Sequence, residues 1–169
     1  MSARCRNPLS GGLLDVALHL VAIRDRRKIV EQAAFRRALS SSYYAVFHTL
    51  CAVGAEGLGF RSAPSEDIEP IYRSLEHRKA QDVLASPKTR QLHEDLARIG
   101  SAFIELRQLR EDADYSQPGR FGSQQRLLTR NETKTLIDLA DETIRILDAL
   151  PIDIRRKLAV ALLVRPSRR

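Results

Sequence analysis

The chain has 169 residues, 43% of them hydrophobic and 5% aromatic, and it carries a net charge of +7 with an isoelectric point near 9.9. This length and hydrophobic fraction match one ordinary globular domain with a single helical core. Two cysteines exclude a disulfide framework and fit a reducing compartment, and the positive charge favours an anionic partner such as RNA.

The N-terminal segment imitates a secretory signal, because Arg4 and Arg6 precede the apolar run LLDVALHLVAI. Asp15 and His19 interrupt that run, no cleavage site of small residues follows it, and it is too short to span a bilayer. We therefore expect a cytoplasmic protein without a membrane segment.

The first helix is predicted from a Ser10 cap to about Ala22. Its apolar residues fall on two sides, which indicates a buried helix. One side consists of Leu13, Val16, Leu20 and Ile23, and the other of Leu14, Leu18 and Val21.

The second helix has the clearest period, and the rest of the chain is expected to cover it. At 100° per residue, a sector about 80° wide holds Phe35, Leu39, Tyr43, Val46, Leu50 and Val53. The opposite side is polar and titratable, and comprises Arg37, Ser40, Ser41, Tyr44, His48 and Cys51. We interpret the apolar side as the core face and the polar side as a candidate functional face.

A third helix is predicted over residues 66–84 with a bend near Pro70, and a fourth over residues 88–114. The fourth repeats apolar residues at Leu92, Leu96, Ile99, Phe103 and Leu106. The same stripe continues to Arg110, so an arginine falls on the packed face. A half-buried arginine needs a partner, and Asp114, one turn later, is the nearest candidate.

A loop without helical period is predicted over residues 116–128. Thr129 and Glu132 match a capping box that starts a fifth helix, which ends at Pro151. A last short helix over residues 154–164 carries apolar residues that need a surface to bury.

The predicted fold is therefore all-α, an antiparallel helical bundle of about five main helices plus a short C-terminal helix. A single domain is expected over residues 1–169, with flexible ends at residues 1–9 and 165–169.

Three stretches stand out in the sequence: RRALSSSYYAVFH at residues 36–48, YRSLEH at residues 72–77 and LREDADY at residues 109–115. Together they resemble the HEPN family of helical proteins. RRALSSSYYAVFH, residues 36–48, resembles the second helix of bacterial members, which commonly has an R-A-x-S-x-x-Y-Y-A-x-F-H pattern. LREDADY, residues 109–115, is similar to the R-x-x-A-D-Y ending of their fourth helix, and YRSLEH, residues 72–77, is a weaker match between the two. The ordered set covers the chain from about residue 13 to residue 150, and implies a helical bundle.

Many HEPN proteins pair as two-fold dimers and cleave RNA without a metal, using an arginine followed after four to six residues by a histidine. By this resemblance, Arg110 is the motif arginine and Tyr115 takes the histidine position, since no histidine follows His93. A phenol with a pKa of about 10 is a poor general base at neutral pH. This departure weighs against ribonuclease activity.

His48 is the alternative histidine. If the polar side of the second helix faces Arg110, the two residues surround a phosphate; otherwise His48 is a helix histidine bonded to a neighbour. In the same way, Arg110 either contacts a phosphate or forms an internal ion pair with Asp114. The nucleic-acid-binding candidates are Arg37, Tyr44, which can stack on a base, and Arg120.

No metal site and no cofactor are expected, because His48 and Cys51 lack further matching ligands. Some HEPN proteins have a partner nucleotidyltransferase that modifies a tyrosine two residues after the motif histidine, a position occupied here by Gln117.

The sequence thus predicts a HEPN-like homodimer that binds RNA or a nucleotide. The resemblance extends this to a metal-independent ribonuclease or toxin of a two-gene toxin–antitoxin system with a nucleotidyltransferase. The alternative is a non-catalytic protein-interaction module that uses residues 109–122 and the last helix as interfaces.

Overall fold

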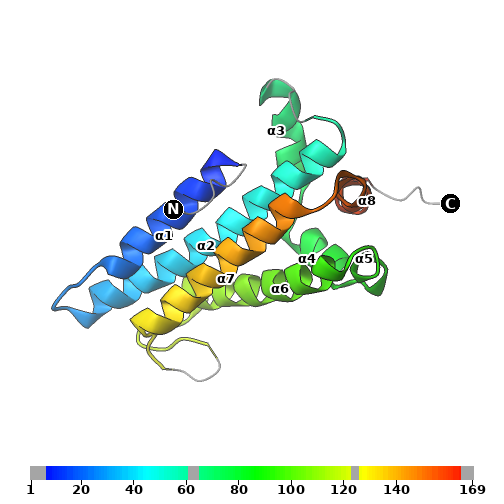
Figure 1. Cartoon of the computed structure of the whole chain (residues 1–169). Coiled ribbons are helices and arrows are strands. Elements are labelled where there is room, and N and C mark those ends of the chain that lie inside the picture. Colours follow the sequence, from blue (N-terminus) through cyan, green and yellow to red (C-terminus); the bar gives the residue numbers. More distant parts are fainter. Residues whose placement is uncertain (1–6, 61–64, 123–125, 165–169) are drawn as a thin grey trace.

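The computed structural model describes residues 7–60, 65–122 and 126–164, and this part of the chain forms eight helices and no strand (Figure 1). The all-α bundle predicted from the sequence is confirmed. The helices are α1 (Pro8–Ala22), α2 (Lys28–Gly57), α3 (Ser65–Ser74), α4 (His77–Ala85), α5 (Pro87–Arg90), α6 (Glu94–Tyr115), α7 (Arg130–Ala149) and α8 (Ile152–Leu163).

The long helix α2 is the centre of the fold. Figure 1 shows α2 running between α1 and α7, and it packs on α6 and α8 as well. Its predicted core face is confirmed, since Phe35, Leu39, Val46 and Leu50 are all buried. Helices α2 and α6 are antiparallel, because contacts that move forward along α2 move backward along α6. Those contacts join Arg36 to Ser116, Ser40 to Asp114 and Tyr44 to Arg110.

The region between α2 and α6 differs from the prediction. The single third helix is two helices, α3 and α4, and the break falls at Leu75 and Glu76 rather than at Pro70, which lies inside α3. The fourth predicted helix begins later, at Glu94, because Pro87 starts the separate turn α5. The His93 side chain then caps α6 by accepting a hydrogen bond from the Asp95 backbone N–H over 3.2 Å.

Helix α1 is buried on one side only, so the prediction of a helix buried on two sides was wrong. Leu14, Ala17 and Val21 enter the core. The other side stays open because α1 packs mainly on α2 and α7. The cap is Asn7 rather than Ser10, which is buried with its hydroxyl 2.9 Å from that of Thr49. The outward stripe consists of Leu9 (51% exposed), Leu13, Val16 (49%), Leu20 and Ile23 (39%), of which Leu13 and Leu20 are half-buried and pack partly against the core.

Helices α7 and α8 follow the prediction closely. The capping box of Thr129 and Glu132 is present at the start of α7. Helix α8 buries Ile154, Leu158 and Leu162, and it crosses α2 at Gly57, where an added Cβ would lie 2.4 Å from the Arg155 carbonyl oxygen. Within the described ranges, no helix is both long and apolar enough to cross a membrane.

Candidate functional site

Arg110 lies at the centre of a polar cluster between α2 and α6. Its Nη2 donates a hydrogen bond to the Tyr44 hydroxyl over 3.0 Å, and its Nε lies 2.9 Å from the Asp114 carboxylate. Nε–H is not aligned for a hydrogen bond and finds no acceptor in the described part of the chain. The guanidinium carbon lies 5.6 Å from the centre of the Tyr44 ring and 5.8 Å from that of Tyr115. Arg110 therefore lies within about 6 Å of two aromatic ring centres, with its side chain 23% exposed.

Asp114 holds this arrangement together. Besides its ion pair with Arg110, the carboxylate accepts hydrogen bonds from the Ser40 hydroxyl over 2.8 Å and from Arg37 Nη2 over 3.1 Å. The Asp114 side chain is only 14% exposed. The ion pair predicted from the sequence is thus present, but one carboxylate serves two arginines, and the cluster keeps a positive charge.

The histidine that lies against Tyr44 is His77, at the start of α4. The two rings are 5.9 Å apart and nearly perpendicular, and the His77 ring also packs on Phe47 at 4.0 Å. Burial lowers the pKa of His77, and the charges of Arg110 and Arg107 lower it further. His77 is therefore neutral at pH 7. The residue was missed from the sequence, although it ends the YRSLEH stretch of the family resemblance.

The proton on the His77 ring can be assigned from its partner. Tyr43 Oη lies 2.7 Å from His77 Nδ1, and burial raises the pKa of the Tyr43 phenol far above its usual range. The phenol therefore keeps its proton, and it has no other acceptor within the described residues. We assign it as the donor to Nδ1, which leaves the imidazole proton on Nε2. His77 consequently offers an N–H donor rather than a base.

His48 sits on the α3 side of the cluster. Its ring lies nearly parallel to that of Tyr72 at 6.3 Å and contacts Phe47 edge-on, while its Nδ1 has no hydrogen-bond partner in the described ranges. Burial lowers the pKa of His48. No contact joins it to Arg110 among these residues. Cys51, on the same side of α2, is buried, and burial raises the pKa of its thiol to about 12.

Tyr115 and Arg120 occupy the end of α6 and the loop that follows. Tyr115 is 76% exposed and covers the Arg110 guanidinium from outside. Arg36 anchors the loop by donating hydrogen bonds to the carbonyl oxygens of Ser116, Gln117 and Arg120 over 2.7–2.8 Å. The Arg120 residue is exposed. The described residues of the loop after α6 are thus irregular, as predicted, and three of their carbonyl groups are fixed to α2.

The nearby Arg107 is already neutralised. Its Nη2 lies 2.7 Å from the Glu111 carboxylate, and its Nη1 donates to the Gln81 side chain. The described residues hold no group of three or more histidine, cysteine, aspartate or glutamate side chains that could bind a metal ion. The uncompensated charge therefore belongs to Arg110 and Arg37, which share Asp114.

Comparison with models of protein families, with curated proteins and with solved structures gives no match. The HEPN resemblance therefore stays a prediction.

Proposed function

We propose that this protein binds RNA or a nucleotide at the surface formed by Tyr44, His77, Arg110 and Tyr115, named here the Arg110 surface. The observation that supports this function is the guanidinium of Arg110, which is partly exposed, lies close to the rings of Tyr44 and Tyr115, and shares the Asp114 carboxylate with Arg37. Such a group attracts a phosphate and is already oriented by its neighbours.

The phosphate contact uses two kinds of donor. Arg110 supplies the charge, and His77 supplies the Nε2–H donor that its hydrogen bond with Tyr43 at Nδ1 leaves unused. Because neither group needs to move far from its place against Tyr44, binding costs little side-chain entropy.

The base contact uses Tyr115. An aromatic side chain that is 76% exposed has little packing role, and it lies directly over the arginine that holds the phosphate. Stacking of a base on an exposed aromatic ring contributes about 1–3 kcal/mol and is tolerant of sequence. The surface is therefore suited to single-stranded RNA or a mononucleotide without strong sequence preference.

The same geometry favours binding over cleavage by one copy of the chain. Cleavage of RNA needs a general base, whereas His77 presents a donor and Tyr115 is a phenol. The HEPN resemblance alone extends this proposal further. It adds metal-independent cleavage by a homodimer, a role in a two-gene toxin–antitoxin system, a nucleotidyltransferase partner and a cytoplasmic location.

The proposed dimer uses the outward stripe of α1. Its five residues follow one another at intervals of four, three, four and three, the spacing of a coiled-coil seam: Leu9, Leu13, Val16, Leu20 and Ile23. Gly12 beside the stripe leaves open space for a second helix. Light scattering should find a dimer for the wild type and a monomer for Val16→Lys, whereas a monomeric wild type contradicts this interface.

The binding test uses a fluorescein-labelled single-stranded RNA of twelve uridines, measured by anisotropy at several salt concentrations. Tyr115→Ala should weaken RNA binding about tenfold through lost stacking and leave competition by inorganic phosphate unchanged. The control is Phe60→Ala, an exposed aromatic side chain beyond the C-terminal end of α2. Denaturing gels of the same mixtures report cleavage.

The second candidate function is protein interaction without RNA binding. The exposed apolar stripe on α1 favours it, because such a stripe is unusual on a free surface. A wild type that neither binds nor cuts the RNA would favour this second function and end the first.

A further inference from the structure

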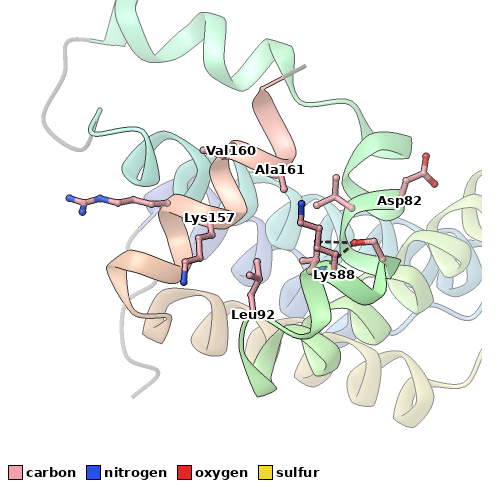
Figure 2. Close-up of a pocket in the computed structure, with 10 residues that line it drawn as sticks. Asp82, Lys88, Leu92, Lys157, Val160 and Ala161 are labelled. Carbon is pink, nitrogen blue, oxygen red and sulfur yellow. Dashed lines mark hydrogen bonds between the residues drawn. The ribbon is translucent and has the colours of Figure 1, made fainter. Parts of the chain in front are cut away.

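A second feature of the molecule lies between α8 and the corner formed by α4 and α5. A pocket of about 640 Å³ opens there (Figure 2). It uses the end of α4, whereas the Arg110 surface uses His77 at the start of that helix. Its lining comprises Asp82, Val83, Ser86, Lys88, Thr89, Leu92, Arg156, Lys157, Val160 and Ala161.

The walls of the pocket are apolar. Helix α8 turns one side toward the core, and its opposite side carries Val160 and Ala161 into the pocket. Figure 2 shows these two residues on one helix and Leu92 facing them from the other side. Val160 is 52% exposed, so a large apolar side chain stays uncovered inside a concave site. A ligand with an apolar body would remove this surface from water.

The polar groups of the wall are already satisfied. Ser86 and Thr89 have their hydroxyls 3.0 Å apart, and Ser86 Oγ accepts a hydrogen bond from the Thr89 backbone N–H over 3.2 Å. Both side chains serve the start of α5. The interior therefore selects a ligand by apolar contact rather than by hydrogen bonds.

The rim of the pocket is cationic. It carries three cationic side chains, Lys88, Arg156 and Lys157, and one acidic side chain, Asp82. Lys88 and Arg156 have no ion pair or hydrogen bond of their side chains with any described residue, and Lys157 has only a distant contact of 3.9 Å with Asp153. In Figure 2, Lys157 and Lys88 lie on opposite sides of Leu92. An anionic group at the mouth would meet two lysines while its apolar body enters the pocket.

We propose that this pocket binds a single-chain amphiphile with an anionic head, of the class of fatty-acid carboxylates and alkyl phosphates. The volume lies within the range of small-molecule sites, which is about 300–1,000 Å³. The cationic rim favours an anionic head group, and the uncovered Val160 favours an alkyl chain inside the pocket. The site is independent of RNA binding at the Arg110 surface.

The test measures binding of laurate and of dodecyl phosphate by calorimetry, both below their micellar concentrations, with dodecanol as the uncharged ligand of equal chain length. The wild type should bind the anions more tightly than dodecanol, and it should melt at a higher temperature when they are present. The two anions distinguish a carboxylate from a phosphate as the preferred head.

Two sets of variants separate the head contact from the chain contact. Lys88→Gln combined with Lys157→Gln should weaken anion binding at least tenfold, because both lysine contacts with the head are lost, and should leave dodecanol binding unchanged. The matched control, Arg24→Gln with Lys134→Gln, removes two exposed cations elsewhere and should change nothing. Val160→Trp fills the pocket from an exposed position and should abolish binding of all three ligands at an unchanged melting temperature.

Failure of the wild type to bind either anion would overturn the proposal. So would anion binding that survives Val160→Trp, because the ligand would then lie elsewhere. Equal losses in the lysine variant and in its control would show an effect of net charge alone, and would also overturn the rim contact.

Discussion

The substitution Arg110→Gln removes the positive charge from this position of α6 and shortens the side chain, while the new amide can still donate a hydrogen bond. The ion pair with Asp114 has side chains 23% and 14% exposed, so it lies between exposed pairs, which contribute about 0.2–1 kcal/mol, and buried ones, whose disruption costs about 3–5 kcal/mol. Asp114 keeps Ser40 and Arg37 as donors and is not left alone. We therefore expect a loss of about 1–2 kcal/mol in the free energy of unfolding, which lowers Tm by roughly 2–8 °C for a chain of this size.

Arg110→Gln should also lower the affinity for RNA, by more than the loss of a solvent-exposed charge would. A hydrogen bond between an arginine and a phosphate contributes about 1.5–3 kcal/mol, which corresponds to a roughly 10- to 150-fold increase in Kd. The slope of log K against log salt should become shallower by about 0.7, because one phosphate contact is lost. Thermal melting and RNA anisotropy are measured on the same preparation, at a temperature where the variant is folded.

Arg98→Gln is the control on the same helix. Arg98 pairs with Glu142 over 2.7 Å, but its side chain is 62% exposed, so its loss should change neither Tm nor Kd measurably. A fall in Tm for Arg110→Gln with unchanged RNA binding would make Arg110 a structural residue and refute the reasoning. Equal losses of RNA binding in both variants would reduce the site to a non-specific basic surface.

Three further outcomes test other parts of the structure. Gly57→Ala should destabilise the protein by about 1–3 kcal/mol in urea denaturation, because the new Cβ would lie 2.4 Å from the Arg155 carbonyl oxygen; an unchanged midpoint would disprove this close crossing of α2 and α8. Thr129→Ala should cost about 1 kcal/mol through the lost cap of α7, while Thr135→Ala on the same helix should cost far less; equal costs would count against the capping box. The pKa of His77 is lowered in the folded state, so stability should be full above the unfolded value of about 6.5 and should decrease as pH falls from there toward the folded pKa. Addition of inorganic phosphate should raise that pKa in an NMR titration, and a static value would place the anion elsewhere.

The helices that cover α2 could be predicted because their apolar residues repeat with a helical period over several turns. Phe35, Leu39, Ile99 and Phe103 are buried as that period requires. The position of Arg110 on the same stripe was visible for the same reason. The capping box at Thr129 was visible because it depends only on neighbouring residues.

The breaks between α3, α4 and α6 could not be predicted in this way. The sequence predicts a bend near Pro70, yet the chain leaves the helix at Leu75, whose side chain is buried. Burial of one residue at a junction depends on tertiary packing, which a periodicity along one segment does not contain. Helix α1 shows the same limit, because two apolar sides in the sequence do not indicate which side meets α2.

The functional face of α2 shows why the candidate site was only half visible. Ser40 and Cys51 belong to its polar stripe but are buried, and Ser40 serves to hold Asp114 on α6. Tyr44 and Arg37 are the members of this stripe that meet Arg110 or share Asp114 with it, and the groups around Tyr44 come from α6 and from the start of α4. A periodicity along one helix identifies the side chains that share one of its faces. The donors at this surface come from different helices and are brought together by the antiparallel packing of α2 and α6. The break that ends α3 therefore shapes the candidate site, because it allows α4 to begin at His77 and to place an imidazole beside Tyr44.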